Sequence, residues 1–341
     1  MKTKLLFSAF ILGFIFSANA QWVSQFSGTT NLLHSVSFVT NDLGYIAEEN
    51  GAILKTINGG STWAQVSGPH PPNGIIQIQF TSIDTGFAIS WDGILKTNNG
   101  GISWQNKFTD SAVAYTWWLS FPTPTIGYAA VGSLGMDSTF LYKTIDAGNT
   151  WSKIFSTSSF DVPSLVYFTD PNTGFMLIDT AICKTINGGI SWVAVPSLTA
   201  GSAMDFPSGS VGYAVGDLGT VLKTTDSGNT WTPQTTPTTY TLYSVSFTSI
   251  DTGYAVGGNG FSGVIIKTVD GGSNWTIDAT ASQSYLSVDF PSASVGYTCG
   301  DNGVIYKRGS ATGIQDNTEG SELTIFPNPS NGIFTLQFSD P

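Results

Sequence analysis

Lys55-Thr-Ile-Asn-Gly-Gly-Ser-Thr-Trp63 is the stretch that decides the fold, because close copies of it return five times along the chain. The later copies run from a lysine to a tryptophan at Lys96–Trp104, Lys143–Trp151, Lys184–Trp192, Lys223–Trp231 and Lys267–Trp275, and a decayed seventh copy begins at Lys307. Successive lysines are 41, 47, 41, 39, 44 and 40 residues apart. A period of about 40 residues with strand-like content is typical of a propeller or a similar repeat array.

Each repeat contains four short segments that are rich in β-branched and aromatic residues and are separated by turn-forming residues. In the sixth repeat they are Ser244–Phe247, Gly253–Gly257, Gly263–Lys267 and a segment that begins at Trp275. This pattern predicts a meander of four strands, A to D, numbered outward from the centre of the array. The phenylalanine that ends strand A recurs seven times, as Phe38, Phe80, Phe121, Phe168, Phe206, Phe247 and Phe290.

The spacing inside the repeats separates two kinds of turn. The gap from the strand-A phenylalanine to the glycine that opens strand B is 6 in all seven copies, and the gap from the lysine to the tryptophan is 8 in all six full copies. The B–C turns and the connections from strand D to the next strand A vary in length. The constant turns are therefore expected on one rim and the variable ones on the other, and binding residues usually lie on variable loops of a rigid scaffold.

The two ends of the array predict a closed ring. No tryptophan follows Lys307, whereas Trp22-Val-Ser-Gln25 resembles the strand-D segments that begin at Trp63 and Trp192. The N-terminal strand would then complete the last blade and remove the open edges of the array. We predict an all-β, seven-bladed β-propeller of four-stranded antiparallel blades over residues 21–309, closed by the N-terminal strand.

The recurring phrase resembles the Asp-box, or bacterial neuraminidase repeat, whose pattern is Ser/Thr-x-Asp/Asn-x-Gly-x-Ser/Thr-Trp. All six copies match, and Asn274 is the one departure at the hydroxyl position. The acidic or amide residue is expected to accept backbone N–H bonds within the turn, and the tryptophan to pack between blades, so a structural role is expected. These residues are Asn58, Trp63, Asn99, Trp104, Asp146, Trp151, Asn187, Trp192, Asp226, Trp231, Asp270 and Trp275.

The whole array over residues 22–308 resembles the photosystem II assembly and stability factor family, and is also similar to sortilin-type and xyloglucan-degrading propellers. The resemblance implies the propeller fold and, for the first family, work as an assembly factor. It does not carry the photosystem role over, because that family's basic surface is missing from a chain with Arg308 as its single arginine.

Both ends of the chain carry features of export. Residues 1–20 read as a signal peptide, with Lys2 and Lys4 before an apolar run and Ala18-Asn19-Ala20 at the cleavage site. The Phe-Pro-Asn-Pro-Ser core within Leu323–Phe338 resembles the opening of a type IX secretion C-terminal sorting domain. We therefore expect a linker over 310–321, a truncated sorting domain over 322–341, a type IX secretion machinery as partner, and a secreted or cell-surface location.

The composition of the chain limits the kinds of partner and site that we expect. Without Lys2 and Lys4 the chain has 10 basic and 23 acidic side chains, a formal charge of −13, which argues against nucleic acid and anionic membranes. Cys183 and Cys299 replace apolar residues of different repeats and are expected to be core residues without a disulfide. No stretch after the signal peptide is long enough to span a membrane. No metal site or cofactor is predicted, and a monomer is expected.

Acidic residues mark the B–C turns of most repeats, at Glu48, Glu49, Asp92, Asp137, Asp179, Asp217 and Asp301. Two of them at a suitable separation would allow glycoside hydrolysis. The same acids would also suit a cation or a basic partner, and pairs such as Asp92-Gly93 are ordinary hairpin turns. A sialidase is excluded, because one arginine cannot form the cluster that such enzymes need for the substrate carboxylate.

Aromatic residues gather on the same variable rim, and Trp118 stands where other repeats have Ser35, Gln77, Ser244 and Ser287. They would either pack across the central channel or contact a sugar or a protein. The predicted ligand-binding residues are Trp91, Asp92, Tyr115, Trp117, Trp118, Asp217, Tyr243, Tyr285 and Asp301. The leading hypothesis is a secreted, non-catalytic propeller that binds a protein or glycan on this rim. The alternatives are a carbohydrate-active enzyme with two carboxylates, and an assembly factor.

Overall fold

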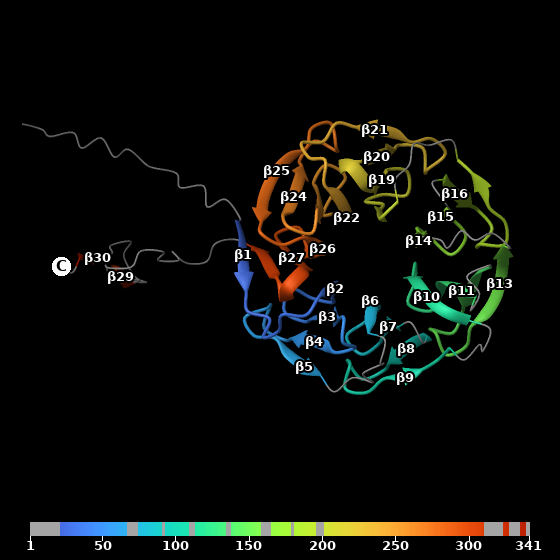
Figure 1. Ribbon diagram of the computed structural model, residues 1–341, viewed down its shortest axis with the longest axis horizontal. Coiled ribbons are helices and arrows are strands. Elements are labelled where there is room, and N and C mark those ends of the chain that lie inside the picture. The colour runs from blue at the N-terminus through green and yellow to red at the C-terminus, as the bar shows by residue number, and fades with distance from the viewer. Residues whose placement is uncertain are drawn as a thin grey trace, which may run out of the picture. The chain divides into compact units, whose positions relative to one another are not determined.

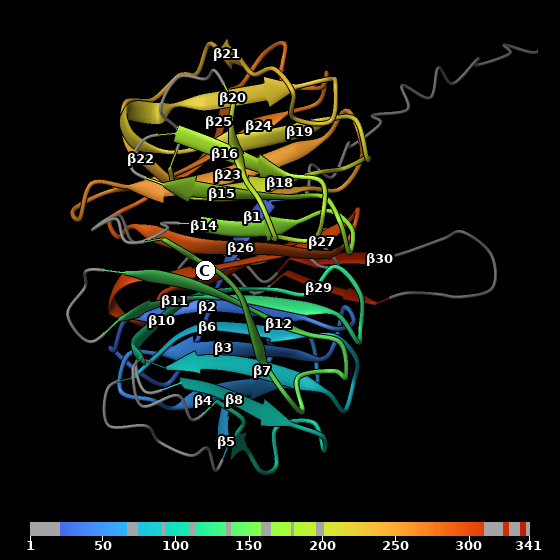
Figure 2. The ribbon, with the colours of Figure 1, turned by 90° about the vertical axis from the view of Figure 1, so that its right-hand side faces the viewer.

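The computed structural model describes residues 21–66, 74–90, 93–108, 113–133, 138–157, 165–178, 181–195, 201–309, 323–326 and 335–338. The chain divides into two compact units, of which Trp22–Gly309 is the larger. This unit is a ring of seven four-stranded antiparallel sheets around a central channel (Figure 1). Seen from the side of the ring, the strands run through its thickness from one face to the other (Figure 2).

The blades follow one another in chain order. The first three are β2 (Leu33–Phe38), β3 (Gly44–Glu48), β4 (Ile53–Thr56) and β5 (Ala64–Val66); β6 (Ile75–Phe80), β7 (Gly86–Ser90), β8 (Gly93–Thr97) and β9 (Gln105–Asn106); and β10 (Val113–Ser120), β11 (Gly127–Ser133), β12 (Thr139–Thr144) and β13 (Ser152–Thr157). In each blade the first strand is the innermost, A, and the last is the outermost, D.

The remaining blades repeat this plan. They are β14 (Leu165–Phe168), β15 (Gly174–Ile178), β16 (Ala181–Thr185) and β17 (Val193–Ala194); β18 (Ala203–Asp205), β19 (Gly212–Val215), β20 (Val221–Thr224) and β21 (Thr232–Gln234); β22 (Thr241–Phe247), β23 (Gly253–Gly258), β24 (Gly263–Thr268) and β25 (Thr276–Ala281); and β26 (Tyr285–Ser292), β27 (Val295–Gly300), β28 (Ile305–Gly309) and β1 (Gln21–Gln25). Short 3₁₀ turns, η1 (Asp217–Gly219) and η2 (Asp301–Gly303), form the B–C turns of blades five and seven.

The N-terminal strand closes the ring, as the sequence predicted. The seventh sheet has the order β1-β28-β27-β26. The indole ring of Trp22 meets the rings of Phe290 and Tyr254 edge-on at 6.0 and 6.1 Å, and its Nε1 donates to Asp278 Oδ2 at 2.8 Å. Trp22 thus takes the place that an Asp-box tryptophan holds in the other six blades.

An aromatic stack joins each blade to the next. The Phe38 ring stacks on Tyr297 of the preceding blade at 3.6 Å and meets Trp63 of its own blade edge-on at 5.9 Å. A Cβ added to Gly44 would lie 2.4 Å from the Phe38 ring. The same arrangement recurs at Phe80, Phe121, Phe168, Phe206, Phe247 and Phe290. Glycine therefore opens strand B because the phenylalanine ring occupies the space of a side chain.

The lysine of the recurring phrase ties neighbouring blades together. Lys55 Nζ lies 5.2 Å from the centre of the Tyr45 ring and donates to Gly100 O of the next blade at 2.8 Å. At the closure of the ring, Lys307 Nζ donates to Gly59 O and the Tyr297 hydroxyl donates to Asn41 O, both at 2.9 Å. The lysine charge is stabilised by the face of the aromatic ring and by the carbonyl oxygens that accept its hydrogen bonds.

The Asp-box turn has the predicted internal bonds. In the first blade, Asn58 Oδ1 accepts the Thr62 N–H at 3.0 Å, and Thr56 Oγ1 accepts the Gly60 N–H at 2.9 Å. Gly60 has a φ of 82°, which glycine adopts without strain. We call the face that carries these turns and the A–B turns the Asp-box face, and the opposite one, with the B–C turns and D–A connections, the loop face.

Of the smaller unit, the structure describes Gln21 and the two strands β29 (Leu323–Phe326) and β30 (Thr335–Phe338), which pair antiparallel. The predicted signal peptide (1–20) and linker (310–321) lie outside the described residues, as does most of the predicted sorting domain. In the part of the chain that is described, no helix is long and apolar enough to cross a membrane. Cys183 and Cys299 are buried and free.

Candidate functional site

The wall of the central channel is built from side chains that bridge neighbouring inner strands. An inner strand is a sheet edge, and its N–H groups that face the next blade need acceptors. Ser35 Oγ accepts the Ile78 N–H at 3.3 Å, Ser37 Oγ accepts the Phe80 N–H at 3.2 Å, and Gln77 Oε1 accepts the Leu119 N–H at 2.8 Å. The result is a polar belt that holds the ring together from inside.

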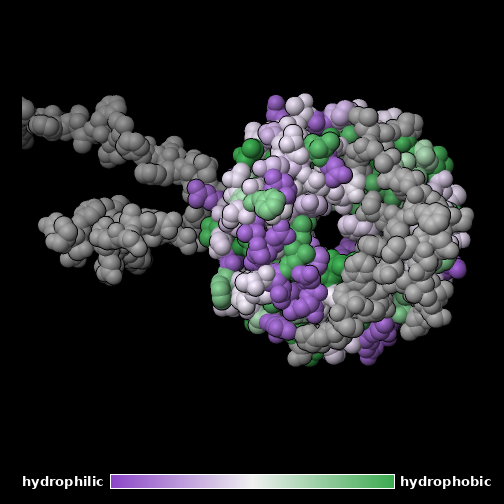
Figure 3. Space-filling model, in the orientation of Figure 1, coloured by the Kyte–Doolittle hydropathy of each residue, from purple (hydrophilic) through white to green (hydrophobic). Residues whose placement is uncertain are grey.

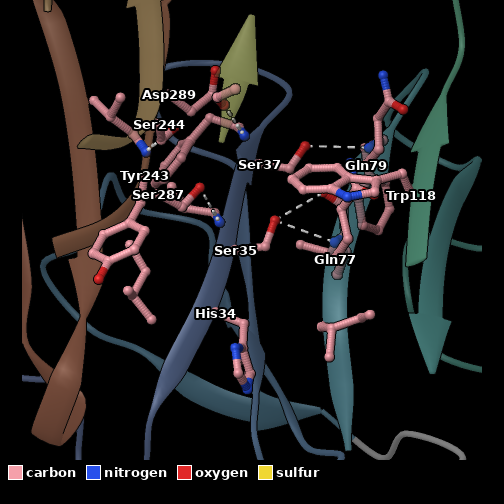
Figure 4. Close-up of a pocket in the computed structure, with 18 residues that line it drawn as sticks. His34, Ser35, Ser37, Gln77, Gln79, Trp118, Tyr243, Ser244, Ser287 and Asp289 are labelled. Atoms are coloured by element: carbon pink, nitrogen blue, oxygen red, sulfur yellow. Dashed lines mark hydrogen bonds between the residues drawn. The ribbon is translucent and has the colours of Figure 1, made fainter. Parts of the chain in front are cut away.

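The channel contains a cavity of about 590 Å³ that opens to solvent (Figure 3). His34, Trp118, Tyr243 and Asp289 are among the side chains that line it. His34 lies at one end of the cavity, and Asp289 and Gln79 lie at the other (Figure 4). Because strand β2 begins on the loop face, His34 marks the mouth of the channel on that face.

Trp118 interrupts the polar belt. It pairs with Ala130 at the register position that Ser35 occupies opposite Ala47. Its half-buried side chain packs against the cores on both sides of the fourth blade and reaches the channel. A large aromatic surface is thus presented where the corresponding positions of blades one, two, six and seven carry serine or glutamine, and those of blades four and five carry Leu165 and Ala203.

Two carboxylates in the wall were not predicted from the sequence. Asp289 Oδ2 accepts the Phe38 N–H and Asp205 Oδ2 accepts the Phe247 N–H, both at 2.6 Å. Burial raises the pKa of Asp289 to about 6, and the charge of Asp205 adds to the effect. Burial also raises the pKa of Asp205, which accepts a hydrogen bond from the Tyr167 hydroxyl as well. The available signal was their place directly before the strand-A phenylalanine, where the other repeats carry polar residues or tyrosine.

Acidic residues lie on the described B–C turns of the loop face, in blades one, five and seven. Buried Glu48 accepts hydrogen bonds from Thr29 Oγ1 at 2.8 Å and Asn31 Nδ2 at 2.5 Å, so it orders the first D–A connection. Asp217 Oδ1 accepts from Thr241 Oγ1 at 3.0 Å, and the Asp217 carbonyl accepts the Thr220 N–H. These acids therefore take part in ordinary turn structure.

A second, polar hollow of about 270 Å³ lies on the loop face at blades six, seven and one, and is lined by Thr30, Asn31, Leu32, Glu49, Gly260, Gln283, Asp301 and Asn302. Asn302 Nδ2 donates to Gln283 Oε1 at 2.6 Å across it. Burial lowers the pKa of His34, while the charges of Glu49 and Asp301 act in the opposite direction. His34 therefore lies within electrostatic reach of this hollow.

The predicted ligand-binding residues lie in different parts of the structure, and some lie outside the described residues. Trp118 and Tyr243 line the channel cavity, Asp301 lines the polar hollow, and Asp217 lies on the turn η1. Trp91 and Asp92 lie outside the described residues, as do Asp137 and Asp179. Tyr115 and Trp117 belong to β10, but their side chains are not described.

The sequence comparison predicts that Tyr243 and Tyr285 occupy comparable places at the starts of strand A in blades six and seven, but the structure places them at different positions. Tyr285 pairs with Gly300 just as Leu242 pairs with Gly257, and its side chain is fully buried. The same register shift follows this pair in both blades, so the residue that corresponds to Tyr243 is Leu286. Tyr285 is therefore a core residue between blades six and seven.

Metal chemistry finds no support in the described residues: no group of three or more His, Cys, Asp or Glu side chains is placed to hold an ion. The described acids of the B–C turns are spread over blades one, five and seven.

Comparisons with known proteins agree with the resemblance seen in the repeats. A family model described as "Photosynthesis system II assembly factor YCF48" matches residues 202–276, in blades five and six. No curated protein matches the chain by sequence. A solved structure described as "YCF48 bound to D1 peptide" has a TM-score of 0.69 at 15% identity, covering 84% of this chain and 96% of that chain.

Two further structures are similar in the same way. YCF48 from Cyanidioschyzon merolae has a TM-score of 0.70 at 17% identity, covering 85% of this chain and 99% of that chain. The WD40 β-propeller domain of Doa1 has a TM-score of 0.68 at 9% identity, covering 86% of this chain and 98% of that chain. At such identities the likeness shows the fold alone.

Proposed function

We propose that this chain is an exported, non-catalytic propeller that binds a protein through its loop face. The proposal rests on a difference between the two faces of the ring. On the Asp-box face, the repeating turns, rings and lysines are engaged in joining blades. On the loop face, the channel opens between connections of variable length, and Trp118 and Tyr243 line the cavity beneath. Half-buried aromatic side chains beside a cavity suit a protein anchor.

A structure of similar fold has been solved with a peptide bound, which supports a protein partner over a glycan. Export rests on the sequence of residues 1–20 and on the Phe-Pro-Asn-Pro-Ser motif that starts at Phe326. We therefore propose a secreted or cell-surface location, reached through a type IX secretion machinery.

The binding proposal is tested by probing the chain from Gln21 to Pro341 on a peptide array and on a glycan array. We expect peptide binding that is lost in Trp118→Ser and kept in Ile57→Ser, a matched exposed position on the Asp-box face. Binding to glycans alone would refute the proposed protein partner. Hydrolysis of a β-glucan that disappears in Asp217→Asn would refute the non-catalytic assignment.

The export proposal needs a separate test. In a bacterium with type IX secretion, the full chain is compared with Phe326→Ala in cell fractions and medium. We expect the wild-type chain outside the cell and the variant retained in the periplasm. Equal distribution of the two would reject this sorting signal.

A further inference from the structure

The lysines of the repeated phrase lie on the Asp-box face, where acids of the neighbouring turns, among them Asp42, Asp84, Asp146 and Asp226, balance their charge. All seven lysines of the repeated phrase lie over an aromatic ring of their own blade: Lys55, Lys96, Lys143, Lys184, Lys223, Lys267 and Lys307. The bonds of Lys55, Lys184 and Lys307 to carbonyls of the next blade fix them on the Asp-box face. Arg308 is held over Tyr254, 3.6 Å from Asp278. These cations are engaged in the scaffold.

The described part of the loop face has few basic residues to balance its acids. Its described turns and connections carry Glu48, Glu49, Asp217 and Asp301, and among those same described segments Lys107 is the one basic residue. A potential of one sign around an opening attracts a partner of the other sign and speeds its encounter.

The mouth of the channel on the loop face also presents apolar side chains. Ile76, Tyr243 and Leu286 line the cavity near His34, and Trp118 lies further along the wall. Described residues that line the cavity include no lysine or arginine, and Gln79 Oε1, at its inner end, is buried with no hydrogen-bond donor. A ligand that brings donors and aliphatic stems fits such a wall, whereas an anionic ligand would meet the Asp289 carboxylate and no lysine or arginine among the described lining residues.

We infer that the partner bound at the loop face is a basic peptide segment. Its apolar or aromatic side chain enters the channel mouth against Trp118 and Tyr243, and flanking lysines or arginines face Glu49, Asp301 and Asp217. This inference rests on the proposed protein-binding function and specifies the chemistry of the partner. Guanidinium and ammonium groups are the donors that carboxylates at a surface hollow bind best.

The test uses the chain from Gln21 to Pro341 and three labelled 12-residue peptides that share leucine and tryptophan positions. The other positions alternate lysine and arginine in the first peptide, glutamine in the second and glutamate in the third. We expect the basic peptide to bind about tenfold more tightly than the neutral one, and to lose most of that advantage at high salt. Fluorescence anisotropy gives the dissociation constants.

Matched variants locate the site. Glu49→Gln with Asp301→Asn should weaken binding of the basic peptide, while Asp42→Asn with Asp84→Asn, two exposed acids of the Asp-box face, should leave it unchanged. Trp118→Ser should abolish binding and Trp118→Phe should restore part of it, with thermal unfolding used to confirm that each variant is folded.

The outcomes separate the two proposals. Equal binding of neutral and basic peptides overturns the basic partner and leaves protein binding standing. Equal losses in the two double variants overturn the assignment to the loop face. If none of the peptides binds and glycans do, both the inference and the proposed function are overturned.

Discussion

At the scale of the residue, one contact explains the most constant spacing in the sequence. The strand-A phenylalanine lies over the glycine that opens strand B in its own blade, and the other side of its ring is covered by an aromatic residue of the preceding blade. The two residues are joined by one A–B turn, so adding or removing a residue there would misplace the ring. The six-residue gap is therefore a packing requirement.

Replacing this glycine should strain the stack. In Gly253→Ala the new Cβ would lie 2.4 Å from the Phe247 ring, which Tyr213 and Trp275 hold in place. We expect a loss of about 1–3 kcal/mol in the free energy of unfolding, the usual cost of overpacking. Urea unfolding measures it, with Gly209→Ala as control because nothing lies within 4 Å of its added Cβ. Equal stability of the two variants would contradict this account.

A second residue-scale prediction concerns the left-handed position of the Asp-box turn. Four copies have glycine there, as at Gly59 with φ 64°, but Ala147 adopts φ 57° and Ser227 φ 60°. An alanine in this region is strained, so Ala147→Gly should raise the free energy of unfolding by about 0.5–1 kcal/mol. Gly59→Ala should change it in the opposite direction. A destabilised Ala147→Gly protein in urea unfolding would show that the strain is relieved elsewhere.

At the scale of the element, β1 is the strand on which the ring depends. It joins the first residues of the propeller to a sheet whose other three strands lie more than 250 residues later. Without it, β28 would be an unpaired edge, and the rings of Phe290 and Tyr254 would lose their cover. The seventh blade also lacks an Asp-box turn, so Trp22 and its bond to Asp278 substitute for that turn.

Truncating Trp22 should open this closure. We expect Trp22→Ala to cost about 3 kcal/mol, near the lower end for loss of a large aromatic side chain because Trp22 is only half-buried. Gln21→Ala, at an exposed neighbour on the same strand, is the control and should be nearly neutral. Thermal unfolding with both variants checks the expectation. A Trp22→Ala protein as stable as the control would mean that the backbone pairing of β1 alone closes the ring.

At the scale of the whole molecule, the sequence predicted what repeats and missed what depends on contact around the ring. The seven strand-A phenylalanines and the likeness of Trp22 to Trp63 were sufficient to predict the number of blades and the closure of the ring. Asp289 was missed because its partner, Phe38 N–H, lies 251 residues away in another blade. Tyr285 was misplaced because the two tyrosines were compared only by their place at the start of strand A. Counting back from the strand-A phenylalanine gives four residues to Tyr243 but five to Tyr285, which agrees with the observed register.

The belt of inner-strand contacts makes the stability of the ring depend on pH. For Asp289 the folded pKa is about 6, above the ordinary value of 3.8, so its contribution to stability is fully present below about pH 4 and is lost as pH rises through 6. A pKa shift of this size corresponds to about 3 kcal/mol in the free energy of unfolding. Asp205 acts in the same direction. His34, with a lowered pKa, acts in the opposite one.

The Asp289→Asn variant isolates this effect, because it keeps an acceptor for the Phe38 N–H and leaves His34 unchanged. We expect the free energy of unfolding of the wild-type protein, relative to that of the variant, to fall as the pH rises from 4 to 7. Urea unfolding midpoints measured at each pH check this. Below pH 4 the two should behave alike, since Asp146 and Asp226, with pKa values lowered to about 2 by hydrogen bonds in their Asp-box turns, lose their contribution in both proteins. Parallel curves over the whole range would mean that Asp289 keeps its charge without cost inside the channel.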